Sequence, residues 1–333
     1  MKIIITGATG FLGRNLAEHF HADGLHVTTT GRSLLVGDEL RKNDIQFKQA
    51  DIMDLDQLNN AFSHADCVIH CAAKSVPWGK YRDFYDTNVV GTRNVIKLCK
   101  KHNIKKIIFI STPSIYFTGK DRYNISEGEP LPDRQASNYA KTKLISETEL
   151  INLQDKGYKV IIFRPRALYG PYDNTIIPRI LRLADQKHMP LINNGRALVD
   201  ITYVDNFVDA IRKSLTAPDN VWNEVYNISN GDPISVKKWF AQILTIFDRP
   251  FKPKNVPESA AKIIAGIMEF GSYLPFIKKE PAMTRFTVGY MSKSMTMSID
   301  KAKQKLNYSP QIINHQGFEK YAKWYHSKWT NVN

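Results

Sequence analysis

The first residues of the chain hold the feature that most constrains its fold. Residues 2–5 form a short apolar run, and Gly7, Gly10 and Gly13 follow it at intervals of three. Residues 11–24 then place apolar side chains at helical spacing. A strand, a glycine turn and a helix in this order are typical of a dinucleotide site, because the turn lets a pyrophosphate approach the helix N-terminus. We predict such a site; a glycine-rich turn that binds nothing is the alternative.

Strand-like apolar runs and helical patterns alternate along the first half of the chain. The predicted strands span residues 26–30, 47–50, 66–72, 107–111 and 160–163, and the predicted helices span residues 56–63, 84–102 and 137–156. This alternation predicts an α/β fold with a doubly wound parallel sheet, because each parallel strand is reached through a helix.

The sequence changes character after Arg164, where two prolines and a glycine follow within seven residues. They predict a loop that leads into a short helix and closes over a substrate. We expect a dinucleotide-binding domain at residues 1–165, to which residues 201–228 return. A smaller C-terminal α/β substrate lobe is expected at residues 166–200 and 229–333.

The end of the second predicted strand bears on the choice of cofactor. Many dinucleotide sites place an acidic residue there for the adenosine ribose. This chain has Gly31, Arg32 and Ser33 instead. An arginine can pair with a 2′-phosphate, so the sequence favours NADP(H). The alternative is NAD(H), with Arg32 as an ordinary surface charge.

Composition limits the possible partners. The 333 residues carry a net charge of +14, with lysines spread along the whole chain. This distribution speaks against a nucleic-acid tail and fits a small anionic substrate or cofactor, although solubility explains it equally well. The three cysteines lack metal-site spacing, so we expect no metal. Without a signal peptide or an apolar run of about 18 residues, we expect a cytoplasmic protein.

Two hydroxyls and a lysine fall at the carboxyl ends of strands, where open α/β sheets place their chemistry. Thr112 follows the fifth predicted strand, and Tyr139 and Lys143 lie four residues apart on a helix that Ser137 or Asn138 could cap. A lysine ammonium nearby would lower the pKa of the tyrosine. Tyr139 could then pass a proton to or from an alkoxide. A surface helix that carries the pair by accident is the alternative.

These motifs together carry a resemblance that covers essentially the whole chain. The residues are TGATGFLG (6–13), Asp51-Ile52, HCAA (70–73), NVVGT (88–92), STPSIY (111–116), YAKTK (139–143), RPRALYGP (164–171) and YVDN (203–206). The chain resembles an extended short-chain dehydrogenase/reductase of the NAD-dependent epimerase/dehydratase superfamily. The resemblance implies a Rossmann fold, NAD(P)-dependent oxidation or reduction at a CH–OH group, and a homodimer formed through residues 84–102 and 137–156.

The resemblance also implies roles for individual residues. Thr112, Tyr139 and Lys143 would form the catalytic triad. The implied cofactor-binding residues are Gly7, Thr9, Gly10, Phe11, Leu12, Gly13, Arg32, Asp51, Ile52, Ala72, Ala73, Lys74, Tyr139, Lys143 and Pro165. Of these, Asp51 and Ile52 would flank the adenine, and the two alanines would lie behind the nicotinamide.

Longer stretches resemble the 3β-hydroxysteroid dehydrogenase-like branch. Residues 70–95, 111–117 and 195–206 are especially similar to bacterial 2-alkyl-3-oxoalkanoate reductases. This similarity implies NADPH-dependent reduction of a β-keto acid. The alternatives are a steroid or sterol dehydrogenase, a sugar-nucleotide epimerase and, outside the enzymes, a non-catalytic dinucleotide-sensing regulator. Dehydration is not expected, because Pro113 and Ser114 stand where a dehydratase would carry an acid pair.

Two features of the second half concern the substrate. Arg166 and Arg179 are candidates to bind a substrate carboxylate, because a guanidinium matches its geometry; the alternative is that they are packing or surface charges. Residues 263–277 hold a single charge, Glu269, with apolar side chains on one helical face. We expect a lid or wall for an apolar substrate. A core helix and an interfacial membrane helix are the alternatives, with membrane contact the least favoured.

Overall fold

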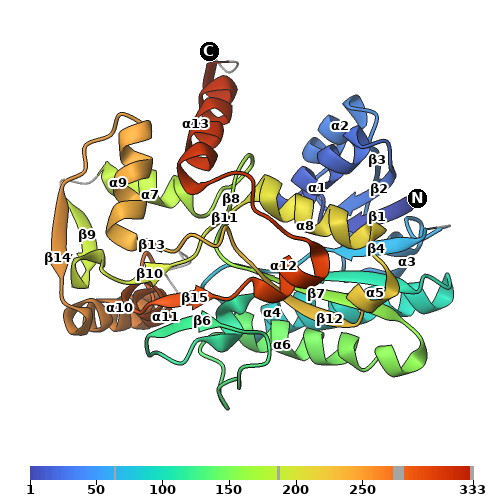
Figure 1. Cartoon of the computed structure of the whole chain (residues 1–333), viewed down its shortest axis with the longest axis horizontal. Helices are drawn as coiled ribbons and strands as arrows, with labels where there is room; N and C mark the ends of the chain where they lie inside the picture. The colour runs from blue at the N-terminus through green and yellow to red at the C-terminus, as the bar shows by residue number, and fades with distance from the viewer. Residues whose placement is uncertain (64, 186–187, 273–280, 331–333) are drawn as a thin grey trace.

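The computed structural model describes residues 1–63, 65–185, 188–272 and 281–330. A seven-stranded sheet lies at its centre, with helices on both faces (Figure 1). In spatial order its strands are β12 (Glu224–Ile228), β7 (Lys159–Pro165), β5 (Lys106–Ile110), β4 (Cys67–His70), β1 (Lys2–Thr6), β2 (His26–Gly31) and β3 (Gln46–Gln49). Every neighbouring pair is parallel, which confirms the predicted doubly wound sheet.

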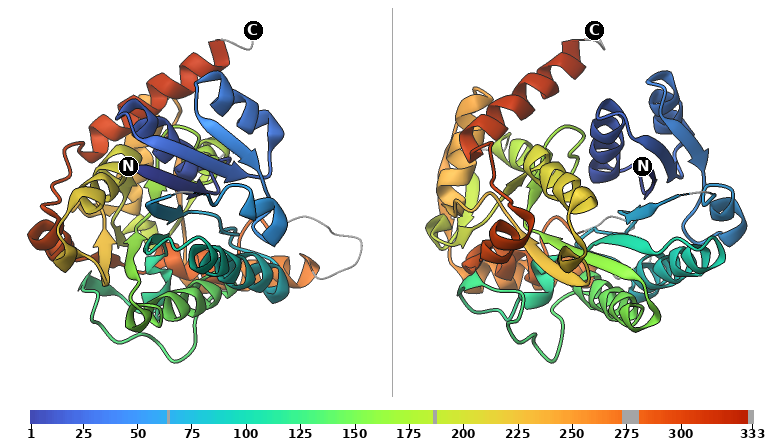
Figure 2. Two further views of the ribbon diagram at one scale, coloured as in Figure 1. Left: turned by 90° about the vertical axis from the view of Figure 1, so that its right-hand side faces the viewer. Right: turned by 45° about the vertical axis from the view of Figure 1, so that its right-hand side comes forward.

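Both faces of this sheet are buried, as its nearly continuous apolar strands require. Ile3 and Ile5 of β1 belong to the core that includes helices α1 (Phe11–Ala22) and α8 (Val204–Thr216). Ile4 belongs to the opposite core, with helix α5 (Gly91–Lys101). Figure 2 shows these two layers, with α1 and α8 on one side of the sheet and the helices of residues 91–151 on the other.

The remaining helices of the first half are α2 (Leu34–Lys42), α3 (Leu55–Asn59), α4 (Tyr81–Phe84) and α6 (Asn138–Ile151). The predicted helical segment at residues 84–102 is confirmed, but it is not one regular α-helix, because α4, a π-helical turn at Tyr85–Val90 and α5 follow one another. The carbonyl of Asn88 in that turn accepts hydrogen bonds from the hydroxyls of Thr92 and Ser146, at 2.5 and 2.9 Å. These bonds give the irregular backbone alternative partners.

The second half builds smaller sheets beside the central one. They are β13 (Ile234–Ser235), β10 (Leu198–Val199), β15 (Met295–Met297) and β6 (Arg122–Ile125) in one sheet, β11 (Thr202–Tyr203) with β8 (Leu168–Tyr169), and β14 (Pro253–Val256) with β9 (Met189–Ile192). The helices are α7 (Ile177–Ala184), α9 (Val236–Ile246), α10 (Glu258–Ser272), α11 (Arg285–Ser292), α12 (Asp300–Leu306) and α13 (Asn314–Thr330). The sequence did not predict α2 or β6.

The order of the strands positions the site. The chain moves from β1 to β2 and β3 on one side, and then crosses to β4 on the other side of β1. Open α/β sheets bind ligands at the carboxyl ends of the strands where the order reverses. The glycine turn after β1 and the loop after β4 meet at this point.

Candidate active site

The backbone around the turn between β1 and α1 leaves no room for a side chain at Gly7 or at Gly13. Gly7 has φ +73°, and a Cβ there would lie 2.7 Å from the backbone nitrogen and Cα of Ala72. A Cβ on Gly13 would lie 2.4 Å from the carbonyl oxygen of Gly7. Gly10 is the N-cap residue of α1, and no acidic side chain lies in the first turn of that helix. The backbone therefore forms a cradle at a helix N-terminus, which suits the phosphates of a dinucleotide.

The end of β2 lies directly beside this turn. A Cβ on Gly31 would lie 2.4 Å from the Thr9 hydroxyl oxygen, so the threonine side chain packs against the strand end. The side chain of Arg32 is 78% exposed, and its Nη1 lies 4.0 Å from a carboxylate oxygen of Asp51. Ile52 packs on α5, where a Cβ on Gly91 would lie 2.9 Å from it.

The loop after β4 contains three predicted cofactor residues, Ala72, Ala73 and Lys74. The backbone N–H of Lys74 donates to Oδ1 of the buried Asn88 at 2.7 Å. The Asn88 amide in turn donates to the Thr142 hydroxyl at 3.0 Å. Asn88 therefore ties this loop to α6. Of the other predicted cofactor residues, Phe11 and Leu12 begin α1, and Pro165 ends β7.

Thr112 and Tyr139 meet at the carboxyl end of β5. Thr112 caps the short 3-10 helix Pro113–Tyr116, and its hydroxyl donates to Ser114 Oγ at 3.0 Å. It also hydrogen-bonds with the hydroxyl of Tyr139. Burial raises the pKa of Tyr139 to about 12, and the hydrogen bond with Thr112 opposes this shift. The expected lowering by Lys143 is therefore wrong for this structure, because burial dominates.

Lys143 projects from α6 one turn beyond Tyr139 and is buried. Its Nζ lies 3.7 Å from the centroid of the Phe109 ring. Burial lowers the pKa of Lys143 to about 7, and the carboxylate of Glu147 opposes this shift. Glu147 is itself buried and pairs with Arg164 of β7 at 2.5 Å. Tyr139, Lys143 and Glu147 thus follow one face of α6 at intervals of four residues.

Arg166 is linked to Thr112 through the side chains of Tyr290 and Ser114. Its guanidinium carbon is 4.0 Å from the centroid of the Tyr290 ring. The Tyr290 hydroxyl accepts a hydrogen bond from Ser114 Oγ at 3.4 Å, and Ser114 contacts Thr112. Arg166 is buried, and within the described part of the chain its Nε has no hydrogen-bond partner. Burial lowers the pKa of Arg166 to about 10, although the nearby carboxylate of Asp200 acts to raise it.

Arg179, the other predicted substrate residue, is exposed on α7. Its proposed contact with a substrate remains a prediction. Sequence reasoning missed Glu147 and Tyr290. The four-residue spacing from Lys143 could have indicated Glu147. Tyr290 comes from α11, 176 residues from Ser114, and no local pattern places it here.

Comparison with known proteins decides the family. Residues 3–229 match the NAD dependent epimerase/dehydratase family, and this segment contains both the glycine turn and the Tyr139–Lys143 pair. The chain belongs to that family. Its predicted activity as an NAD(P)-dependent oxidoreductase acting on CH–OH groups agrees with this membership and with the named relatives.

Several curated relatives of this epimerase/dehydratase family member have named activities, and two of them are compared with it below. The chain is 30% identical to a 2-alkyl-3-oxoalkanoate reductase of Shewanella oneidensis, over 95% of this chain and 84% of that protein. It is 26% identical to the sterol-4-alpha-carboxylate 3-dehydrogenase, decarboxylating, of Bos taurus, over 98% and 92% of the two chains. A UDP-glucuronic acid 4-epimerase from Bacillus cereus, solved with NAD, shares the fold at 23% identity, with a TM-score of 0.77 over 99% of this chain and all of that one.

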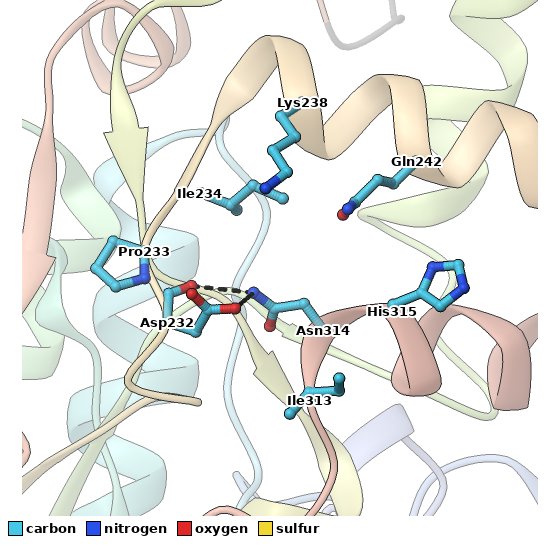
Figure 3. Close-up of a pocket in the computed structure, with 8 residues that line it drawn as sticks. All are labelled: Asp232, Pro233, Ile234, Lys238, Gln242, Ile313, Asn314 and His315. Carbon is cyan, nitrogen blue, oxygen red and sulfur yellow. Dashed lines mark hydrogen bonds between the residues drawn. The ribbon is translucent and has the colours of Figure 1, made fainter.

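A separate hollow in this family member lies between the start of α9 and the start of α13 (Figure 3). Its volume is about 180 Å³, below the roughly 300 Å³ or more of typical ligand pockets. Asn314 spans its floor by donating to the carbonyl and carboxylate of Asp232, at 3.0 and 3.2 Å. None of the predicted catalytic or cofactor residues lines it.

Proposed function

We propose that this chain uses NADPH to reduce the ketone of an apolar 3-oxo acid, such as a 2-alkyl-3-oxoalkanoate, to a secondary alcohol. One observation carries the proposal. The buried guanidinium of Arg166 contacts the Tyr290 ring, the Tyr290 hydroxyl contacts Ser114, and Ser114 contacts Thr112, which is hydrogen-bonded to Tyr139. A carboxylate site beside a proton-donating site suits a substrate in which the two groups are close.

The backbone cradle at Gly7 and Gly13 supports a dinucleotide as the cofactor, because a Cβ would fill the space that the phosphates need. Arg32 supports NADP(H) over NAD(H). Its side chain is exposed at the end of β2, and an arginine pairs well with a 2′-phosphate. Ala72, Ala73 and Pro165 would hold the nicotinamide end. A bound NADPH would supply the hydride for the ketone carbon.

The hydroxyl groups of Tyr139 and Thr112 would stabilise the negative charge that develops on the ketone oxygen. The Tyr139 phenol gives its proton to this oxygen as the C–O bond becomes single, and a phenol near pKa 12 is neutral and ready to donate. Rotation of the Thr112 hydroxyl away from Ser114 would let it donate to the same oxygen. The ammonium of Lys143 would stabilise the resulting tyrosinate. A proton from solvent then restores the phenol.

Arg166 would hold the substrate carboxylate. Arginine binds carboxylates through two parallel hydrogen bonds, and here its Nε already lacks a partner among the described residues. The names of both relatives describe an oxygen-bearing carbon next to a carbon that carries a carboxylate. This shared arrangement supports an acidic substrate. A sterol carboxylate oxidised in the reverse direction would use the same residues.

The test measures NADPH oxidation with a 2-alkyl-3-oxo acid and with the matching ketone that lacks the carboxylate. Wild type should prefer the acid, and Arg166→Met should raise KM for the acid by about tenfold or more while leaving the ketone unchanged. Arg179→Met is the matched control, since it removes the other candidate. If Arg179→Met loses the preference for the acid and Arg166→Met keeps it, the substrate carboxylate binds at Arg179 on α7. Equal rates for acid and ketone in wild type would contradict the proposal.

Two further predictions belong to this proposal. The resemblance predicts a homodimer through residues 84–102 and 137–156, and sedimentation of the purified chain would measure it. Cytoplasmic location also remains a prediction, which fractionation of the source cells would check.

A further inference from the structure

Helix α10 exposes an unusual amount of apolar surface. Its exposed large side chains are Ile263 (66% exposed), Ile264 (44%), Ile267 (68%), Met268 (39%) and Phe270 (73%). Successive α-helical residues are about 100° apart, so these five fall on one side of the helix, within an arc of roughly 160°. The exposed face does not fit a core helix, one of the two alternatives to the expected lid or wall, for residues 263–272; residues 273–277 lie outside the described part of the chain.

The opposite side of α10 fixes this orientation. Ala261 and Ala265 are fully buried and pack with Val288 of α11. Glu269 is buried on the same side, and its carboxylate accepts hydrogen bonds from the backbone N–H and the Nε of Arg285 at 2.7 and 2.6 Å. Small residues and a tethered carboxylate therefore face the protein. The packing of these residues fixes the orientation of α10, and its apolar face therefore points outward.

Helix α10 lies at the edge of the molecule, beside α11 (Figure 1). Its main packing partner is α11. That helix carries Tyr290, which contacts Ser114, and Phe286, whose ring lies 5.7 Å from that of Phe117. The side chains beside Thr112 and Ser114 therefore come from α11, and not from residues 263–272, where the lid or wall was expected. The apolar face of α10 points away from α11 and remains without a role in the catalysis.

Cations border this apolar face. Lys262 lies on α10 next to the Glu269 side of the helix, and the exposed guanidinium of Arg285 lies on the same edge. Glu258 pairs with both Lys262 and Lys293, so one carboxylate serves two ammonium groups. Lys254 is exposed on β14, just before the helix. The three cations Lys262, Arg285 and Lys293 thus outnumber the two carboxylates that pair with them, Glu258 and Glu269.

The positive charge beside this face favours an anionic partner over a second copy of the chain. A second copy of the chain would bring the same cations together, and the chain as a whole carries +14. An anionic lipid surface has complementary charge and accepts apolar side chains between its acyl chains. No helix within the described residues is long and apolar enough to cross a bilayer, so contact would be at the interface.

We propose that α10 lies in the plane of an anionic membrane surface. Ile263, Ile267 and Phe270 enter the acyl region, with Ile264 and Met268 at its margin. Lys262 and Arg285 lie at the level of the lipid headgroups, where long cationic side chains reach the interface. The site stands independently of the proposed substrate, because neither the apolar face nor its cations belong to the catalytic group.

The experiment is flotation of the full-length protein with lipid vesicles of two compositions. One contains phosphatidylethanolamine and phosphatidylglycerol, and the other contains phosphatidylcholine alone. Wild type should float with the anionic vesicles, and the double variant Ile263→Ser/Ile267→Ser should bind them about tenfold more weakly or worse. Ile313→Ser is the control, because Ile313 is 56% exposed on a different segment. Circular dichroism and NADPH binding should be unchanged in all variants, which excludes misfolding.

Each other outcome overturns the proposal. Equal flotation of wild type and the double variant would place lipid contact elsewhere on the chain. Equal binding to both lipid compositions would show that the cations do not contribute to binding, which contradicts an anionic surface as the partner. If wild type ignores vesicles but forms an oligomer that the double variant abolishes, the face is an interface between copies of this chain. If wild type neither floats nor oligomerises, the face has no membrane role.

Discussion

Glu147 holds the guanidinium of Arg164 in a two-point ion pair that is buried behind the candidate active site. The Nη2–Oε2 distance is 2.5 Å and the Nε–Oε1 distance is 3.1 Å. The carboxylate lies one helical turn beyond Lys143 and raises the pKa of that lysine against the effect of burial. Arg164 is also hydrogen-bonded to the hydroxyl of Tyr116. Glu147 is therefore a positioning residue, which supports the charge of Lys143 without touching the reacting atoms.

Glu147→Gln should lower the free energy of unfolding. It should also shift the upper pH limit of activity to lower pH. Removing one partner of a buried ion pair leaves the Arg164 charge uncompensated, at a cost of about 3–5 kcal/mol in the free energy of unfolding. The pKa of Lys143 should fall further below about 7, because its only described supporting carboxylate is neutralised. The alkaline limb of kcat against pH should then move to lower pH.

The control for this variant is Glu149→Gln on the same helix. Glu149 pairs with Arg93 at 2.6 Å, but both side chains are partly exposed, so the loss should stay within about 1 kcal/mol. If Glu147→Gln lowers stability but leaves the pH profile of wild type, Glu147 has a structural role alone.

The buried Lys143 should also make the stability of the cofactor-free protein depend on pH. Burial lowers its pKa in the folded state to about 7, whereas the unfolded chain keeps the ordinary value of 10.5. Between these values the unfolded state binds the extra proton, so the folded state gains stability as pH rises. Compared with Lys143→Met, wild type should gain up to about 1.4 kcal/mol per pH unit across this window.

Urea unfolding of both proteins at pH 7, 8 and 9 measures this difference. Lys141→Met is the control, because Lys141 is exposed on the same helix and its variant should follow the slope of wild type. A constant difference between wild type and Lys143→Met would show that Lys143 keeps its proton throughout this range.

The sequence predicted the central sheet because both of its faces are buried, which gives each strand a plain apolar run. It also predicted the catalytic group as far as local spacing reaches, with Tyr139 and Lys143 on one helix and Thr112 at a strand end. It could not predict Tyr290, because only tertiary packing of α11 brings that ring to Arg166. The shift of the Tyr139 pKa was predicted with the wrong sign, since the extent of burial does not appear in a residue pattern.

Tyr139→Phe should greatly lower turnover without weakening the binding of NADPH. The phenol is the proposed proton donor, and losing a positioned acid lowers kcat by about 10²–10⁴-fold. The aromatic ring remains, so NADPH binding in a fluorescence titration should be retained. Tyr123→Phe is the control, because that ring is exposed on β6. Turnover at the rate of wild type would exclude Tyr139 as the donor, and the alternative of a non-catalytic sensor predicts no turnover even in wild type.

Gly13→Ala should weaken binding of NADPH and NADH alike. The new methyl group would lie 2.4 Å from the Gly7 carbonyl, so the turn that holds the phosphates must move. We expect the Kd for both cofactors to rise by about tenfold or more. Gly128→Ala is the matched control, because a Cβ there meets no atom within 4 Å. Unchanged affinity in Gly13→Ala would mean that the dinucleotide does not bind across this turn.

Arg32→Ala should change the choice of cofactor without changing the fold. The side chain is 78% exposed, so its loss should leave the melting temperature near that of wild type. A charge-assisted hydrogen bond to a 2′-phosphate contributes about 1.5–3 kcal/mol, so the Kd for NADPH should rise by about tenfold or more. The Kd for NADH should stay the same, because NADH lacks that phosphate. Arg82→Ala, at a side chain 90% exposed, should alter neither value. If wild type binds both cofactors equally, Arg32 is a surface charge, and NAD(H) becomes the cofactor to test with the 3-oxo acid.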